Sequence, residues 1–188
     1  MQILQDAENI LLEGAQGYSL GINAGFYPYC TSRDCTPARF MADMGIPLPY
    51  LRRIIGTLRL HPIRVGSPEG GFSGPGYDDQ NELDWAEMGV DAETTTLTGR
   101  KRRGFSWTQQ QIEEAILACM PDEIFMNFCN YAPSEVDRIK SQIHVACGKA
   151  GKHAEIRYTG WGPTINDVEE SLLNPCNMTA EEMETGHF

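Results

Sequence analysis

The second half of the chain alternates between helical and extended patterns, and this alternation limits the fold more than any other feature. Thr108 is a credible N-cap for the segment TQQQIEEAILACMP. Its apolar residues recur at helical spacing and would form one stripe: Ile112, Ala115, Ile116 and Cys119. EIFMNFCNY then has the composition of a buried strand, a second helix is expected from Ser134, and AEIRYTGWG indicates another strand. This order predicts an α/β domain with a mostly parallel sheet and flanking helices.

The first half contains less regular structure. NILLEGAQG is a short apolar run that ends in glycine, which predicts a buried strand followed by a loop. Residues 18–40 are rich in Gly, Pro and hydroxyl residues and are expected to form one long loop. PYLRRIIGTLRL predicts a helix that passes into a strand, and DWAEMG a short helix ended by Gly89. Between them, SPEGGFSGPGYDDQ carries too much Gly and Pro for regular structure.

A length of 188 residues suits one ordinary domain. We assign residues 1–166 to a partial α/β domain, and residues 167–188 to an acidic tail that is expected to fray. The expected first strand lies almost at the start of the sequence, with no helix of its own to cover it. Because parallel strands are normally buried on both faces, we expect the chain to be the C-terminal part of a larger domain.

Charge and composition exclude several classes of function. The net charge is -11, with 26 acidic against 15 basic residues, which argues against binding a nucleic-acid polymer or an anionic membrane. No apolar run approaches the ~20 residues of a membrane span, and the first residues lack the pattern of a secretory signal. The six cysteines form no CxxC pair and no metal set is complete, so we expect no metal ligands on this chain and a reduced, cytoplasmic protein. Cys147 is expected to pack in a core.

The segment TLTGRKRR, residues 96–103, concentrates four cations in this acidic chain. Arg100 and Arg102 alternate along what is expected to be an extended loop, so both side chains could point the same way. Two guanidinium groups on one side are suited to a carboxylate or a phosphate, because each can bind two oxygens at once. The alternative is a solvated basic loop whose cations pair with nearby acids.

Two further residues are candidates for nucleotide contacts. Gln16 follows the first expected strand, and its amide could contact a purine edge, although a turn or helix-cap role fits equally well. Thr31, in YPYCTS, offers a hydroxyl to a phosphate, or belongs to an ordinary turn.

Five motifs in this order resemble the adenylosuccinate synthetase family: EGAQG, YPYCTS, RVG, TGRKRR and YTGWG. The resemblance extends from about Leu11 to Gly162. It implies a fold related to the P-loop nucleotide hydrolases. The enzymes of the family are ligases, usually dimeric, that join L-aspartate to C6 of a purine nucleoside monophosphate. They use magnesium and a nucleoside triphosphate. A 6-phosphoryl intermediate is formed and then displaced by the aspartate amine.

The resemblance also implies a role for individual residues. Gln16 would contact the purine ring near C6, Thr31 the monophosphate, and the backbone of Val65 the ribose. Thr98, Arg100 and Arg102 would hold the aspartate carboxylates, with Arg100 also reaching the ribose. Asn130 would contact the base of the triphosphate.

The departures from the family pattern are informative. No Gly-rich phosphate loop is present. We therefore expect the catalytic residues, and most of the magnesium and triphosphate contacts, in a missing N-terminal portion. For the same reason we expect no turnover from this chain alone. Leu97 replaces a family Thr. NFCN, residues 127–130, replaces Thr-Lys-x-Asp. Because Asn cannot accept both hydrogen bonds that guanine donates to Asp, ATP or dATP is favoured over GTP.

Several alternatives remain open from the sequence. The NFCN segment and the long Gly-rich excursion after RVG resemble a viral branch that acts on dGMP, whereas the main branch acts on IMP. A companion N-terminal chain or a homodimer would be the protein partner. The chain would be a split gene product or a truncated frame, or a non-catalytic nucleotide-binding or interaction module that kept the fold.

Overall fold

The computed structural model describes residues 6–66 and 72–171, and these form two compact units, Met1–Arg52 and Arg53–Phe188. Each unit is described separately. In the part of the chain that the structure describes, no helix is long and apolar enough to cross a membrane.

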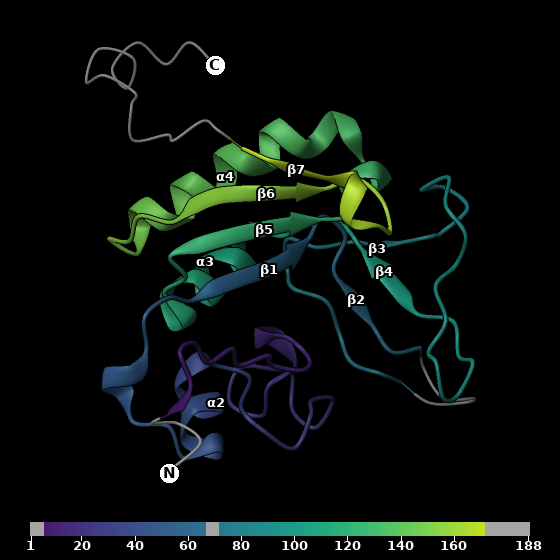
Figure 1. Ribbon diagram of the computed structural model, residues 1–188. Helices are drawn as coiled ribbons and strands as arrows, with labels where there is room; N and C mark the ends of the chain where they lie inside the picture. Colours follow the sequence, from purple (N-terminus) through teal and green to yellow (C-terminus); the bar gives the residue numbers. More distant parts are fainter. Residues whose placement is uncertain (1–5, 67–71, 172–188) are drawn as a thin grey trace. The chain divides into compact units, whose positions relative to one another are not determined.

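The second unit contains a four-stranded sheet in the order β1-β5-β6-β7 (Figure 1). β1 (Ile55–Arg59), β5 (Glu123–Asn127) and β6 (Glu155–Gly160) are parallel, and β7 (Val168–Glu170) is antiparallel to β6. The predicted mostly parallel sheet is therefore confirmed. Residues 168–170 were expected in a frayed tail, but here they pair as β7; residues 172–188 lie outside the described residues.

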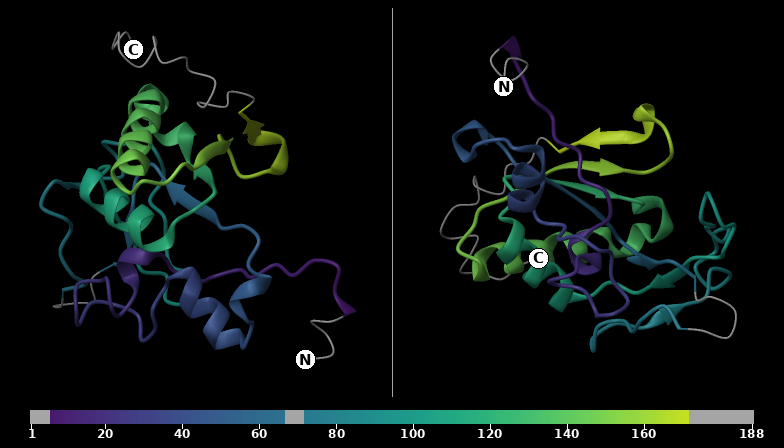
Figure 2. Two further views of the ribbon diagram at one scale, coloured as in Figure 1. Left: turned by 90° about the vertical axis from the view of Figure 1, so that its left-hand side faces the viewer. Right: turned by 90° about the horizontal axis from the view of Figure 1, so that it is seen from below.

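Helices α3 (Gln109–Cys119) and α4 (Val136–Lys149) cover one face of this sheet (Figures 1 and 2). Ile124 and Met126, alternate residues of β5, point toward the helices, as does Ile156 of β6. They form one buried core with three helical residues, Ile116, Ile139 and Ile143. The predicted stripe on α3 is confirmed, since Ile112 and Ile116 are buried. Cys147 lies in the same core, as expected.

The start of α3 explains why the helix begins where the sequence predicts. The Thr108 hydroxyl accepts a hydrogen bond from the Gln111 amide at 3.2 Å. The Asp79 carboxylate accepts bonds from the Thr108 hydroxyl and from the amides of Gln109 (2.8 Å) and Gln110 (3.1 Å). Burial alone would raise the pKa of Asp79, but these hydrogen bonds outweigh it and hold the pKa below its ordinary value. A helix end whose amides are paired in this way is well defined.

A smaller antiparallel sheet in the order β2-β4-β3 lies beyond the carboxyl end of β1. It consists of β2 (Ile63–Arg64), β3 (Glu82–Leu83) and β4 (Arg103–Phe105). The sequence did not predict this sheet, because its strands are too short for a period to show. As expected, the described part of the Gly-rich excursion, residues 72–80, has no regular structure.

Three local expectations were wrong. Residues 9–17 form no strand: Leu11 is 87% exposed, and no described strand pairs with the segment. In place of a helix from Pro49, a short 3-10 turn, Leu48–Tyr50, follows Pro47, and the β-branched Ile54 and Ile55 then lead into β1. DWAEMG forms a turn that ends at Gly89 with φ +68°, and not a helix.

Within its described residues, the first unit contains the α-helix α2 (Pro37–Met44) and the short 3-10 turns Tyr18–Leu20 and Leu48–Tyr50. The expected long loop therefore ends earlier than residue 40. The signal was present: Pro37 occupies the first helical turn after Thr36, and Gly45 ends the helix at φ +65°.

Candidate functional site

The basic segment lies on a β-hairpin formed by residues 93–102, which we call the basic hairpin. The Arg102 amide donates to the Glu93 carbonyl at 2.7 Å, Thr94 bridges Lys101, and the Thr95 amide donates to the Arg100 carbonyl at 2.9 Å. Gly99 closes the turn at φ +61°, a conformation that strongly favours glycine. The predicted extended loop is thus a hydrogen-bonded hairpin, which fixes where its cations lie.

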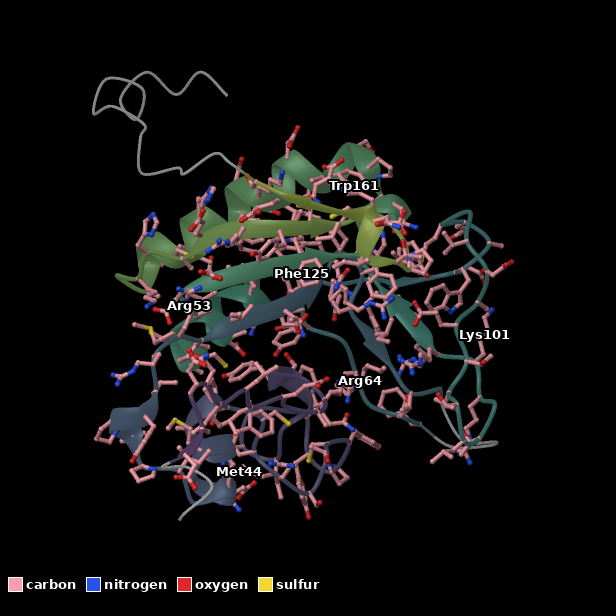
Figure 3. The ribbon with its side chains drawn as sticks, in the orientation of Figure 1. Met44, Arg53, Arg64, Lys101, Phe125 and Trp161 are labelled. Atoms are coloured by element: carbon pink, nitrogen blue, oxygen red, sulfur yellow. The ribbon has the colours of Figure 1, made fainter. Side chains whose placement is uncertain are left out.

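A pocket of about 560 Å³ lies beside this hairpin. It is lined by Gly66, Phe72, Glu82, Leu83, Asp84, Trp85 and Arg100–Arg103. Arg100 and Arg102 therefore share one pocket, as expected of a pair that holds one anion. Figure 3 shows Lys101 on this segment, well away from Phe125 on the four-stranded sheet.

The four cations are not equivalent. The Arg103 guanidinium pairs with Glu82 at 2.6 Å and also donates to the Gly74 carbonyl at 2.6 Å. Arg102 approaches Glu93 only at 4.0 Å. Neither Arg100 nor Lys101 forms an ion pair with any residue that the structure describes. The alternative of cations paired with nearby acids therefore describes Arg103 and, at a longer distance, Arg102, whereas Arg100 and Lys101 have no acidic partner among the described residues.

The tip of the hairpin is exposed. Thr98 is exposed, and its hydroxyl shares a hydrogen bond with the hydroxyl of Thr95. Leu97, at the position of a family Thr, is 97% exposed and contributes no polar group. Thr98 is therefore held by the turn and faces solvent.

Val65 and Gly66 follow β2 and lie next to the hairpin. Val65 is 61% exposed. Gly66 is buried against the hairpin, and a methyl group added to it would overlap the Lys101 carbonyl oxygen. This close approach brings the predicted ribose contact and the basic hairpin together.

We expect Gly66→Ala to lower the free energy of unfolding by more than about 1 kcal/mol, because the added carbon forces the hairpin backbone to move. Urea unfolding measures the loss, and the amide spectrum of residues 93–103 should shift. Gly148→Ala, on α4 with open space around its added carbon, is the matched control and should be neutral or stabilising. Equal unfolding midpoints for Gly66→Ala and the unchanged protein would contradict this packing.

The NFCN segment follows β5. Phe128 has φ +61°, and the Arg59 guanidinium lies 3.7 Å from the centre of its ring. Tyr131 meets the same ring edge to face, with centroids 5.2 Å apart. Asn130 is exposed in the 3-10 turn Cys129–Tyr131. The predicted base contact is therefore accessible and stands beside an aromatic cluster.

Gln16 and Thr31 belong to the first unit, and the basic hairpin belongs to the second. Gln16 is exposed at φ +71° on a loop, and not at the end of a strand as predicted. Thr31 is half-buried and its amide donates to the Leu20 carbonyl at 2.7 Å.

Magnesium has no evident ligands on the described residues. No group of three or more His, Cys, Asp or Glu side chains among them gathers closely enough to hold a metal ion.

Comparison with known proteins places these features in a family. Residues 1–146 match the family model of adenylosuccinate synthetase. The N6-succino-2-amino-2'-deoxyadenylate synthase of Vibrio phage phiVC8 is 55% identical over 88% of this chain and 48% of its own length. The adenylosuccinate synthetase of Methanocaldococcus jannaschii is 39% identical over 53% of this chain and 27% of its own length.

A solved structure agrees with these matches. The succinoaminodeoxyadenylate synthetase of cyanophage S-2L, bound to dGMP and dATP as an energy donor, has a TM-score of 0.76 and 38% identity, and the match covers 91% of this chain and 47% of that one. This likeness confirms the predicted fold class. The chain spans about half the length of the curated phage relatives that it matches. With its matching family model and its shared fold, the chain belongs to the adenylosuccinate synthetase family.

Proposed function

We propose that this chain supplies the aspartate pocket and part of the nucleotide pocket of a ligase that joins L-aspartate to C6 of dGMP. The choice of dGMP as the substrate rests on how much of this chain matches the phage synthases. The Vibrio phage synthase matches 88% of this chain at 55% identity, whereas the archaeal adenylosuccinate synthetase matches only 53% at 39%. The product would be N6-succino-2-amino-2'-deoxyadenylate.

The basic hairpin supports the aspartate role. L-aspartate carries two carboxylates, and Arg100 and Arg102 line one pocket. Arg100 has no ion pair with a described residue, and the ion pair of Arg102 with Glu93 is long, at 4.0 Å. A bidentate guanidinium contact fixes both the position and the plane of a carboxylate. Held in this way, the substrate presents its amine in one direction, and this orientation converts an encounter between two molecules into a reaction within one complex.

The chemistry follows from the substrates. The triphosphate transfers its terminal phosphoryl group to O6 of the purine as N1 loses its proton, which gives the diphosphate and a 6-phosphoryl nucleotide. The aspartate amine then attacks C6, the C6–O6 bond breaks, inorganic phosphate leaves and the amine loses a proton. In this scheme Arg100 and Arg102 hold the nucleophile, Val65 lies against the ribose, and Thr98 adds a hydroxyl to the aspartate pocket. Gln16 and Thr31 would contact the purine ring and the monophosphate from the first unit.

For the triphosphate we propose ATP or dATP. Asn130 offers one N–H donor group and one carbonyl acceptor, which suits adenine, whose edge presents both an amino donor and ring-nitrogen acceptors. Guanine would require two acceptors on the same side chain. The structure of the cyanophage relative contains dATP.

The substrate choice is tested by reconstitution. We expect this chain, mixed with a polypeptide that supplies the half of the phage synthases that it does not match, to convert dGMP at least ~10-fold faster than IMP when both compete for L-aspartate and dATP. Such a ratio requires only about 1.4 kcal/mol of discrimination. Mass spectrometry separates the two succinylated products. Preferential conversion of IMP would contradict the proposal, and nucleotide binding with no product would favour a non-catalytic module.

A further inference from the structure

We propose that Glu93 is a positioning residue: its carboxylate orients Arg102 and joins the basic hairpin to Arg59, at the end of β1, and to Tyr131, which follows β5. The identity of the ligand held by Arg102 rests on the proposed function. The network itself rests on contacts within the second unit.

The first contact is with Arg59, the last residue of β1. One guanidinium nitrogen donates to Oε2 of Glu93 at 3.2 Å, and a second donates to Oε1. The two side chains are only 19% and 21% exposed. A bidentate pair this well shielded from water has a fixed geometry and is weakly screened by salt.

The second contact is with the hairpin. Glu93 and Arg102 face each other at its base, where the Arg102 amide donates to the Glu93 carbonyl at 2.7 Å. Their side chains also approach, with Nη1 of Arg102 at 4.0 Å from Oε2 of Glu93. Arg102 is therefore held by its own backbone partner, and one guanidinium nitrogen is directed toward the carboxylate.

The third contact reaches the segment that carries Asn130. The Tyr131 hydroxyl donates to Oε1 of Glu93 at 3.3 Å, and Arg59 lies over the Phe128 ring. Burial, and next the charge of Glu93, raise the pKa of Tyr131, so this phenol stays protonated and able to donate. One carboxylate thus connects the proposed aspartate pocket with the proposed base contact.

Neutralisation of Arg102 by Glu93 and positioning of Arg102 by Glu93 predict opposite changes in anion affinity for Glu93→Gln. If the carboxylate only neutralised Arg102, its removal would leave a freer cation and tighten the binding of an anion. If it positions Arg102, its removal releases Arg59 and the hairpin base, and anion binding weakens. A charge-assisted hydrogen bond contributes about 1.5–3 kcal/mol, which corresponds to ~10-fold or more in affinity.

The experiment uses the full chain labelled with 15N-arginine. In Glu93→Gln we expect the Nε–Hε signals of Arg59 and Arg102 to broaden by exchange with water, and the Kd for L-aspartate to rise ~10-fold. Glu93→Asp keeps the charge but shortens the reach, and should behave like Glu93→Gln. Glu113→Gln, whose carboxylate pairs with Lys149 on the helical layer, is the matched control and should change neither readout.

The outcomes separate the two proposals. Unchanged Arg102 signals in Glu93→Gln, tighter L-aspartate binding, or full recovery in Glu93→Asp would overturn the positioning role. Should the unchanged chain fail to bind L-aspartate while the arginine signals still depend on Glu93, the positioning role stands and the assignment of this hairpin to aspartate falls. If Glu93→Gln does not fold, the arginine signals of Glu93→Asp decide the question.

Discussion

Arg102→Ala should lower aspartate-dependent product formation by the reconstituted ligase about 100-fold or more, because truncating one partner of a buried, hydrogen-bonded charge pair costs 2–5 kcal/mol. The Arg102 side chain is 33% exposed and lines the pocket beside the hairpin, and its ion pair with Glu93 is long, at 4.0 Å. Initial rates at several L-aspartate concentrations measure the effect. Binding of dATP should change little.

The matched control is Arg138→Ala. This arginine pairs with Glu135 on the exposed side of α4, and its removal takes away the same charge and the same number of side-chain atoms. The control should retain full activity. An Arg102→Ala enzyme with an unchanged rate, or one that loses dATP binding to the same degree, would contradict the assignment of the basic hairpin to aspartate.

Ile143→Ala should lower the free energy of unfolding by about 2–5 kcal/mol. Ile143 is 0% exposed on α4 and belongs to the core that the two helices share with the parallel strands. The loss combines the transfer energy of the missing methyl groups with the cavity that they leave. Chemical denaturation in urea measures it, and the slope of the transition should stay constant.

Val145→Ala, two residues away on the same helix, is the control for this change. Val145 is 54% exposed, and alanine has the higher helix propensity, so the variant should be neutral or slightly stabilising. Equal losses for the two variants would mean that α4 does not pack against the sheet as described.

Periodicity predicted the parts of the fold in which local and tertiary signals agree. On α3, the N-cap at Thr108 and the stripe through Ile112 and Ile116 both specify the same helix, and the structure contains it. β5 was likewise predicted as a short apolar run between two helices, and β6 as the extended segment that follows the second of them. These elements carry the four-stranded sheet and its helical layer.

Elements that depend on distant partners were not predictable in this way. The apolar run at residues 9–17 has the composition of a strand, but a strand needs a neighbour to pair with, and no described segment supplies one. In the small sheet, β4 pairs with both β2 and β3. These strands are far apart in the sequence, so no local sequence pattern predicts the pairing. α2 was missed for a different reason, since the Thr-Pro start and the glycine end were visible in the sequence.

In the candidate site, too, local sequence features were predictable and contacts between distant residues were not. Arg100 and Arg102 were proposed from charge and spacing alone, and the structure shows that they line one pocket. Glu93 was missed, because its partners Arg59 and Tyr131 are 34 and 38 residues away along the chain. Only the fold brings a strand end, a hairpin base and a 3-10 turn together around one carboxylate.

The most direct test of the central claim is mass spectrometry of the product formed from dGMP, dATP and 15N-labelled L-aspartate by this chain and its complementary half. We predict a succinylated deoxynucleotide whose exocyclic nitrogen at C6 carries the label, formed only when both polypeptides are present. If an intact phage synthase makes this product under the same conditions and a well-folded reconstituted pair does not, the account of this chain as the aspartate-binding part of such a ligase is wrong.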